Sequence, residues 1–217
     1  HSFNFPDGEG YYEFYTRAGD RAGNYEAAPP AADTECAYEI VAPQSEVDQI
    51  IPYWQTVTVL DITATANDTL GTIESGVMEV EFWYRFSPDN VIFGAWALFY
   101  TDTDFADGGW NMTFDFPDGE GYYQFYSRAR DYAGNYEAAP PTFDTECGSD
   151  SVPPESDIDA ISPYWYDAPI NLTATASDGV SGVDFVEFWY NYTADNVTYS
   201  GWTYYDTDWN YTDGCNV

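Results

Sequence analysis

Carboxylates are the most abundant reactive groups in this 217-residue sequence, which holds 38 acidic side chains and only 5 basic ones. Several fall in short clusters whose oxygen atoms could ligate calcium, a cation that prefers oxygen donors. The clusters are DTDFAD at 102–107, DTDW at 206–209, PDGEG at 6–10 and 117–121, and ASDGVSG at 176–182. None has the twelve-residue EF-hand spacing, and chance clusters are expected in so acidic a chain. The sequence therefore requires no cofactor, assigns no metal ligands, and leaves calcium as an alternative.

Groups typical of catalytic sites are scarce. The single histidine is His1, and lysine is absent. The sequence has no G-x-S-x-G elbow, Cys/His pair, phosphate-binding loop or zinc-ligand spacing. We therefore expect a protein that is not an enzyme.

Glycosylation is a second kind of chemistry that the sequence indicates. It carries N-x-S/T sequons, which are acceptor sites for N-linked glycans in secreted proteins. The sequons are at Asn67, Asn111, Asn171, Asn191, Asn196 and Asn210. Together with three cysteines, they predict an extracellular or cell-surface protein carrying N-linked glycans.

The net charge of −33 excludes one class of partner. A surface this negative repels the phosphate backbone, so we expect no nucleic-acid binding. The sequence also lacks a run of about 18 apolar residues, so no membrane span is predicted.

The elements that must position these groups are β-strands. Runs of alternating apolar residues are bounded by turn sequences such as PDG, SPDN and AGN, and no segment keeps a helical period. The inward residues predicted on four strands are Leu60, Ile62, Ala64 and Ala66; Val80, Phe82, Tyr84 and Phe86; Trp110, Met112, Phe114 and Phe116; and Tyr123, Phe125, Ser127 and Ala129. The expected fold class is all-β, with sandwich domains in tandem.

An internal repeat defines the domain organisation. The stretch FPDGEGYYQFYSRARDYAGNYEAAPP at 116–141 recurs almost letter for letter at 5–30, an offset of 116 − 5 = 111 residues. Likewise 50–68 matches 161–178, and 75–96 matches 181–202. Written from C-terminus to N-terminus, DGCNV·HSFNFPD aligns without a gap to DGGWNMTFDFPD at 107–118, which equates Cys215 with Gly109. We therefore expect a complete domain at 36–146, the opening strands of a second domain at 147–217, and closing strands of a preceding copy's domain at 1–35.

The two motifs SGVxxVEFWYxxSxDNVxxxxW and FPDGEGYYxFYSRAxDxAGNYE resemble the tandem immunoglobulin-like, fibronectin type III-like repeats of secreted archaeal and bacterial surface proteins. The resemblance covers nearly the whole chain. It implies immunoglobulin-like sandwiches and gives Tyr12 and Tyr123 the tyrosine-corner role of that fold. The split second copy departs from a simple linear array of domains.

The split predicts assembly, because a sandwich without its closing strands exposes its core and its sheet edges. The donated side chains would be Phe3, Phe5, Tyr12, Phe14, Thr16 and Ala18, and the accepting core would contain Ile170, Leu172, Val186, Phe188 and Tyr190. Head-to-tail contacts of this kind give an open filament unless they close a ring. The chain begins at His1, so we expect either a processed subunit that exchanges strands or an excerpt of a longer repeat array. Closure within one molecule would need a chain reversal across roughly 40 Å.

The cysteines bear on the same joint. Cys147 lies at the expected entrance to the second domain, near the predicted loop that holds Cys215. We therefore expect a Cys147–Cys215 disulfide, with Cys36 free or cross-linked to a neighbour. The alternative is a Cys36–Cys215 bond between subunits, because three cysteines cannot all pair within one chain.

The sequence thus predicts a structural subunit of a surface filament, thread or sheath whose main partner is another copy of itself. The alternative is an adhesin or sugar-binding stalk that uses outward aromatic rings to stack on surface glycans. The candidate rings are Trp83, Trp189, Tyr15 and Tyr126. Packing between neighbouring domains or filaments is the competing role for these rings.

Overall fold

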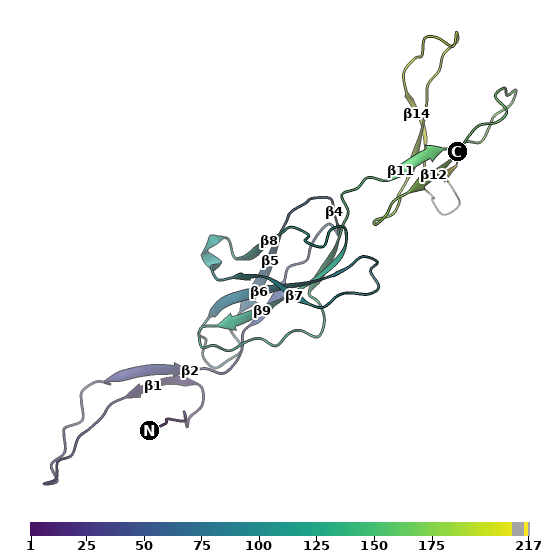
Figure 1. The fold of residues 1–217 in the computed structure, drawn as a ribbon. Coiled ribbons are helices and arrows are strands. Elements are labelled where there is room, and N and C mark those ends of the chain that lie inside the picture. Colours follow the sequence, from purple (N-terminus) through teal and green to yellow (C-terminus); the bar gives the residue numbers. More distant parts are fainter. Residues whose placement is uncertain (210–214, 217) are drawn as a thin grey trace.

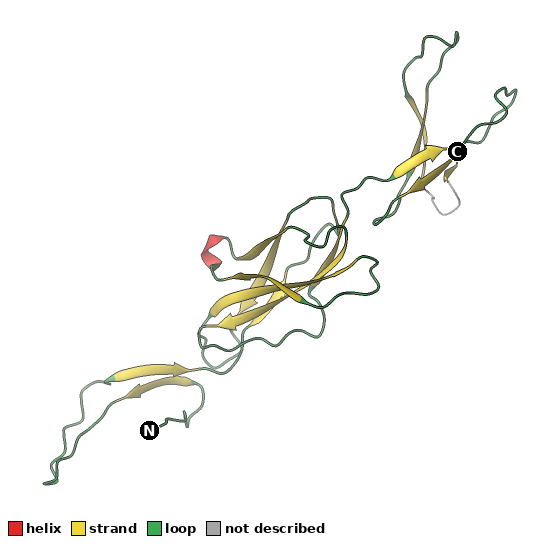
Figure 2. Cartoon of the chain, in the orientation of Figure 1, coloured by secondary structure: helices red, strands yellow, loops and turns green. Residues whose placement is uncertain are grey.

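The structure is a computed structural model that describes residues 1–209 and 215–216, the last two by their backbone alone. Figure 1 shows an elongated chain in three parts: an N-terminal hairpin, a central domain and a set of C-terminal strands at the opposite end. The described residues form strands and loops with one short 3-10 helix, η1 (Phe105–Asp107), and no α-helix (Figure 2). The prediction of an all-β fold is confirmed.

The central domain contains two sheets. One has five strands in the order β4-β10-β9-β6-β7, with β10 parallel to β4 and the other pairs antiparallel. Its strands are β4 (Trp54–Gln55), β6 (Val77–Ser87), β7 (Ala97–Asp102), β9 (Gly121–Asp131) and β10 (Thr145–Ser149). The other sheet has three antiparallel strands, β3 (Gln44–Val47), β5 (Leu60–Asn67) and β8 (Trp110–Phe114).

A single hydrophobic core lies between these sheets. Side chains alternate across a strand, so every second residue of β5, β6, β8 and β9 faces the opposite sheet. The inward residues predicted from this alternation are buried in the core or packed against it, and Ser127 is buried beside them. Phe114 lies at the centre, with ring centroids 4.7 Å from Phe99 and 5.0 Å from Phe125. Two sheets around one core are compatible with a β-sandwich.

A tight turn leads into β9. Phe116 and Gly119 have φ angles of 48° and 85°, and the Gly119 amide donates to the Phe116 carbonyl at 3.0 Å. The Tyr123 hydroxyl donates to the Gly119 carbonyl at 2.7 Å. A hydroxyl bound to the backbone a few residues upstream is the contact that the tyrosine-corner role requires.

The last strand of the central domain runs further than the sequence indicates. β10 belongs to the five-stranded sheet and ends at Ser149, and β2, described below, ends at Tyr38. Cys147 is therefore inside a strand, 0% exposed, where the sequence analysis placed it at a domain entrance. Its thiol is free, so the expected Cys147–Cys215 disulfide is wrong for this structure. The physical reason is alternation along β10, which points Cys147 into the core.

The N-terminal hairpin pairs β1 (Gly10–Phe14) with β2 (Thr34–Tyr38). The C-terminal part contains two small antiparallel sheets. One has the order β11-β12-β15, from Glu155–Ile158, Thr173–Ser177 and Cys215–Asn216, and the other pairs β13 (Val186–Tyr190) with β14 (Thr203–Asp208). In the first sheet Cys215 lies opposite Ala174, just as Trp110 lies opposite Ala64 in the central domain. The gapless alignment of Cys215 with Gly109 is therefore off by one residue.

Candidate assembly site

The N-terminal hairpin is a copy of the closing strands of the central domain. β1 pairs with β2 in the register of β9 with β10: Tyr12 lies opposite Cys36 as Tyr123 lies opposite Cys147. The Tyr12 hydroxyl donates to the Gly8 carbonyl at 2.5 Å, which repeats the Tyr123 turn. The strand pair β9–β10 of the central domain is thus reproduced, already folded as a hairpin, in the N-terminal part of the chain.

Side-chain hydrogen bonds repeat as well. The Thr16 amide donates to Asp33 Oδ2 at 2.9 Å, as the Ser127 amide does to Asp144 Oδ2 at 2.9 Å. The Ala18 amide donates to Glu26 Oε2 at 3.2 Å, the counterpart of the bond between Ala129 and Glu137 at 2.9 Å. Identical or closely similar residues at an offset of 111 therefore specify one local structure in two different surroundings.

What differs between the copies is burial. In the central domain β9 lies between β10 and β6, whereas β1 pairs only with β2 among the described residues. Phe3 is 47% exposed, although its counterpart Phe114 is 0% exposed. The donated residues predicted from the sequence remain together: Phe3 packs edge-on against Phe5, Tyr12 and Phe14, while Thr16 and Ala18 lie exposed beyond the end of β1.

The C-terminal strands form the matching incomplete half. β13 and β14 reproduce β6 and β7, including the register shift at Phe188/Trp189 that β6 has at Phe82/Trp83. β6 also pairs with β9 along its other edge, whereas β13 pairs only with β14 in the part of the chain that the structure describes. The described C-terminal residues contain no counterpart of β9 or β10.

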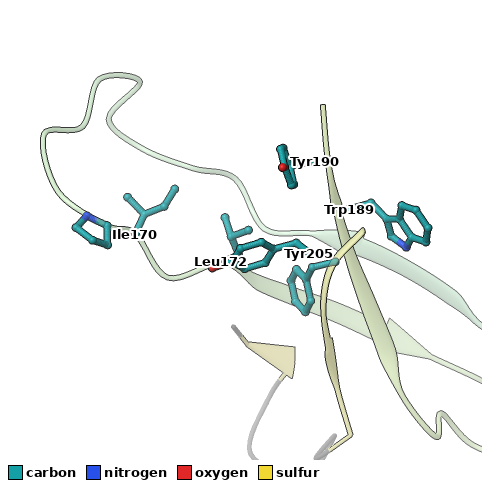
Figure 3. A pocket seen from close by; sticks show the side chains of 7 residues that line it. Ile170, Leu172, Trp189, Tyr190 and Tyr205 are labelled. Carbon is teal, nitrogen blue, oxygen red and sulfur yellow. The ribbon is translucent and has the colours of Figure 1, made fainter. Parts of the chain in front are cut away.

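A hollow of about 380 Å³ opens on the apolar side of these strands (Figure 3). It is lined by Pro169, Ile170, Leu172, Phe188, Trp189, Tyr190 and Tyr205. Four predicted acceptor residues line it, and the fifth, Val186, is buried with Phe188 in a small cluster. In the central domain, Tyr84 and Phe99 stand where the repeat places Tyr190 and Tyr205, and their rings contact Phe114. The hollow is therefore shaped by the residues that surround Phe114 in the complete copy.

The two junctions along the chain use the same contact. Glu9 Oε1 accepts a hydrogen bond from the Ile40 amide at 3.0 Å, and Glu120 Oε1 accepts one from the Ser151 amide at 3.0 Å. Glu9 Oε2 also accepts from the Thr72 amide at 3.2 Å. The Ile40 and Thr72 amides hold the pKa of Glu9 below its usual range. Consecutive parts of the chain are thus joined by one repeated contact.

The predicted glycosylation sites and the cysteines differ in their exposure to solvent. Of the sequons, Asn67, Asn171 and Asn196 are exposed, Asn111 and Asn191 are half-buried, and Asn210 lies outside the described residues. Cys36 is exposed with a free thiol, and the Cys215 side chain lies outside the description. Burial raises the pKa of the Cys147 thiol to about 12, which makes that thiol unreactive at neutral pH.

The predicted calcium clusters are used within loops. Asp102 accepts from the Asp104 and Asn111 amides, and Asp104 caps η1 by accepting from the Ala106 amide. The carboxylates that do converge in the described part of the chain are Glu39, Asp68 and Asp131, which the sequence analysis did not single out. A signal was available, because the repeat places an acidic residue at each counterpart: Asp150, Asp178 and Asp20.

Two of the four outward aromatic residues, Trp83 and Tyr126, lie in a closed cluster on the five-stranded sheet. The other two, Trp189 and Tyr15, are 49% and 55% exposed. Tyr126 is 5% exposed, because Trp83 stacks on it at 5.8 Å and Trp96 packs edge-on at 4.4 Å. Arg85 lies over the Trp96 ring at 4.6 Å from its centroid. Tyr126 was expected as an exposed ring, and its burial leaves no open stacking face at this position.

Comparisons with known proteins add no identification. No family model, no curated protein and no solved structure matches this chain. Among the described residues, no helix is long and apolar enough to cross a membrane. The features that bear on function are therefore the internal repeat, the N-terminal hairpin and the C-terminal strands.

Proposed function

We propose that this protein is a structural subunit of an extracellular filament, built from immunoglobulin-like domains that polymerise head to tail by strand complementation. One observation carries the proposal: the hairpin β1–β2 repeats the sequence, register and hydrogen bonds of β9–β10, the strands without counterparts in the described C-terminal part. The hairpin of one copy would close the sandwich that the preceding copy leaves open.

The central domain specifies the register of this joint. In it Ala129 lies opposite Val80, Ser127 opposite Phe82, Phe125 opposite Tyr84 and Tyr123 opposite Phe86. Transferred through the repeat, β1 of one copy would lie against β13 of the preceding copy. The expected pairs are Ala18 with Val186, Thr16 with Phe188, Phe14 with Tyr190 and Tyr12 with Tyr192.

Polar contacts would complete the joint. In the central domain Asp144 Oδ2 accepts from the Val47 amide at 2.9 Å, and Glu137 Oε2 accepts from the Ser45 hydroxyl at 2.6 Å. The counterparts of Val47 and Ser45 are Ile158 and Ser156, and Ile158 is 53% exposed here against 2% for Val47. We expect Ile158 and Ser156 to donate to Asp33 and Glu26 of the neighbouring copy.

The energetic driving force is apolar burial. The six donated side chains, mostly aromatic, would contribute on the order of 10 kcal/mol of gross burial, part of which is lost in ordering the segment. The donating and accepting parts lie at opposite ends of the chain (Figure 1), so each joint leaves a free partner at both outer ends. Such heterologous contacts extend into open fibres.

We expect no disulfide in this joint. Cys147 lies opposite Tyr123, whose ring contacts Phe114, four residues along β8 from Trp110. Four residues of strand span roughly 13 Å. In the joint, Cys36 and Cys215 would occupy the positions that Cys147 and Trp110 have in the central domain. These two positions are too far apart for an S–S bond. The joint would be held by packing and hydrogen bonds, on an acidic, glycosylated surface outside the cell.

A rearranged chain tests this function. Moving residues 1–38, which contain all of β1 and β2, from the N-terminus to follow Val217 supplies the missing strands within one molecule. We expect the wild-type chain to polymerise and the rearranged chain to remain monomeric in light scattering, with its second domain protected from hydrogen exchange. A monomeric wild-type chain, or a rearranged chain that polymerises equally well, would contradict the proposal.

The alternative of a longer covalent array is separated by the native material. Denatured filaments should yield chains near 24.4 kDa plus glycan if strands are exchanged between subunits. A covalent array would instead yield chains several times longer.

A further inference from the structure

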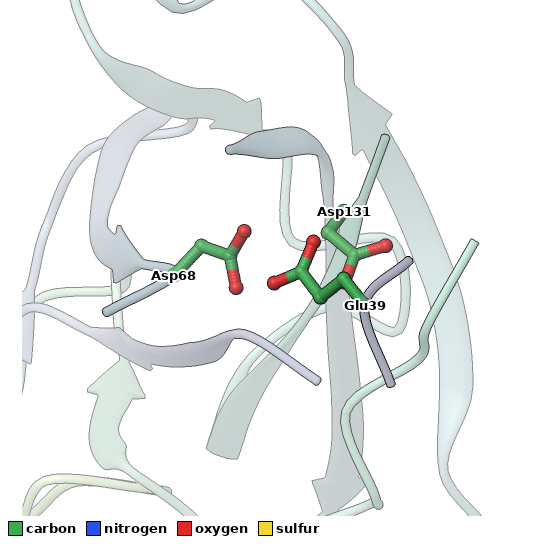
Figure 4. A group of neighbouring side chains, drawn as sticks. All are labelled: Glu39, Asp68 and Asp131. Carbon is green, nitrogen blue, oxygen red and sulfur yellow. The ribbon is translucent and has the colours of Figure 1, made fainter. Parts of the chain in front are cut away.

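Three buried carboxylates converge where the N-terminal hairpin meets the central domain. Glu39 follows β2, Asp68 follows β5, and Asp131 ends β9. They are 7%, 5% and 0% exposed, and one oxygen of each lies within 4.8 Å of the others. Figure 4 shows the Asp68 and Glu39 carboxylates pointing toward each other, with Asp131 beside Glu39.

Backbone amides hold one oxygen of each of the three carboxylates in place. The Ser75 amide donates to Glu39 Oε2 at 2.9 Å, and the Gly76 amide donates to Asp68 Oδ2 at 2.7 Å. Asp131 accepts from the Gly134 and Asn135 amides and from the Asn135 side chain. These bonds fix the directions of the carboxylates before any ligand arrives.

The remaining oxygens are unpaired. Glu39 Oε1 and Asp68 Oδ1 are buried and have no hydrogen-bond partner. The two ion pairs of the described residues, Arg128–Glu81 and Arg130–Glu79, lie elsewhere. Buried carboxylates that lack a counter-charge are strongly unfavourable, and mutual repulsion adds to the penalty. A bound cation would supply the missing counter-charge.

We propose that Glu39, Asp68 and Asp131 bind a calcium ion. Calcium takes oxygen ligands at about 2.3–2.6 Å, so two ligands on opposite sides of one ion are at most about 5 Å apart. The 4.8 Å limit of this cluster meets that condition. No histidine or cysteine takes part, which argues against zinc. Magnesium usually keeps several waters and suits a less protein-enclosed site.

The ion would fasten the junction between the hairpin and the central domain. Glu39 belongs to the segment that leaves the hairpin, whereas Asp68 and Asp131 belong to the two sheets of the central domain. The Asn135 side chain also donates weakly to the Glu39 carbonyl at 3.4 Å. Binding at these three points would hold consecutive domains at a fixed angle.

The same arrangement recurs, divided between the two ends of the chain. The Ser181 amide donates to Asp150 Oδ2 at 2.9 Å and the Gly182 amide to Asp178 Oδ1 at 2.8 Å, repeating the bonds of Glu39 and Asp68. Asp20 accepts from the Asn24 amide and side chain as Asp131 does from Asn135. If the proposed head-to-tail joint forms, Asp20 of one copy completes a second site with Asp150 and Asp178 of the preceding copy. This extension rests on the proposed function.

Thermal unfolding of the full chain tests the first site. After treatment with a chelator, added calcium should raise the melting temperature of the wild-type chain, because binding to the folded state stabilises it. Glu39→Gln and Asp68→Asn should lose this rise. In chelator, Glu39→Gln should fold at least as stably as wild type, since it removes one of three repelling charges.

Asp115→Asn is the matched control, because Asp115 is an exposed acid whose repeat counterpart is Asn4. It should keep the full calcium response, with sodium chloride at equal ionic strength as a further control. The proposed calcium site would be ruled out if calcium left the wild-type melting temperature unchanged, or if it still raised the melting temperature of Glu39→Gln. The second result would indicate diffuse binding to the acidic surface.

Sedimentation of the polymer tests the second site. At calcium 100 times the site's Kd, the free-subunit concentration at equilibrium with polymer should fall roughly 100-fold. Asp20→Asn should abolish that fall while leaving the calcium response of the central domain unchanged. Polymer that is equally stable in chelator and in calcium defeats only the second site. Absence of polymer in both conditions defeats the proposed function, and the first site is still measurable.

Discussion

Phe3 offers the sharpest test of the joint, because one side chain links the donated hairpin to the accepting hollow. Its counterpart Phe114 is fully buried and touches Tyr84 and Phe99, the counterparts of the hollow residues Tyr190 and Tyr205. Phe3 itself is 47% exposed. We therefore predict that Phe3→Ala weakens polymerisation strongly and leaves the central domain unchanged.

The magnitude follows from the exposed area. About half of a ring surface of roughly 200 Å² would be buried on joining. At about 25 cal/mol per Å² this contributes ~2.5 kcal/mol, and two edge-on ring contacts add about 1–3 kcal/mol. The sum of about 3.5–5.5 kcal/mol is close to the usual cost of about 3–5 kcal/mol for a core Phe→Ala change. At 1.4 kcal/mol per tenfold, the critical concentration should rise by about two and a half to four orders of magnitude.

The assay is the concentration of unassembled subunit that remains after sedimentation. Phe105→Ala is the matched control, because Phe105 is 63% exposed on η1. It lies in neither the N-terminal hairpin nor the C-terminal strands. Its critical concentration should stay near that of wild type. An unchanged value for Phe3→Ala, or an equal rise in the control, would refute the reasoning.

Three further predictions concern single side chains. In the free chain Cys36 should react with a thiol reagent at pH 8 while Cys147 does not, because burial raises the pKa of Cys147 to about 12. On polymerisation Cys36 should become protected from the reagent. A Cys36 thiol that stays reactive in the polymer would count against the joint. Tyr123→Phe should destabilise the central domain by about 1 kcal/mol through loss of its bond to Gly119, as measured by urea unfolding against the exposed control Tyr132→Phe. Because the pKa of Glu9 is lowered in the folded chain, its stabilisation of the hairpin junction is present above its ordinary value of 4.5 and is lost as pH falls through the lowered value. NMR titration of the Ile40 and Thr72 amides should show this transition, and Glu9→Gln should remove it.

The core of the central domain could be predicted from the sequence because its strands alternate strongly. Apolar residues occupy every second position of β5, β6 and β8, and between Tyr123 and Ala129 β9 departs from this pattern only at Ser127. A period of two indicates a strand with one buried face. The repeat then extended the prediction to both ends of the chain. These inferences needed only local pattern and self-similarity.

The strand β10 escaped prediction for a physical reason. Its inward residues are Thr145, Cys147 and Ser149, which are small and largely polar, so the segment lacks the apolar alternation of a strand. It is buried because β9 and β4 pair with it on both sides. The misplacement of Cys147, and with it the expected disulfide, follows from this missing signal.

The carboxylate cluster was missed because its members are far apart in the sequence. Residues 39 and 68 lie just after β2 and β5, residue 131 ends β9, and no local spacing connects the three. In a chain with 38 acids, each of the three is unremarkable alone. Only the fold brings them together, although the acidic counterparts at 20, 150 and 178 show in retrospect that the repeat preserves all three.

Tyr126 shows the limit of an alternation argument. The pattern correctly places its side chain on the outer face of the five-stranded sheet. It does not reveal that Trp96, thirty residues earlier, folds back over that face. Outward orientation and exposure are therefore separate properties, and only the first can be predicted from period.

A cryo-electron microscopy structure of the assembled protein would show directly whether subunits exchange strands. We predict that β1 of one subunit lies between its own β2 and the β13 of a neighbour, with Phe14 opposite Tyr190 and the Phe3 ring in the hollow beside Tyr205. A polymer in which residues 1–35 make no sheet contact with a neighbouring subunit, or pair in another register, would contradict it.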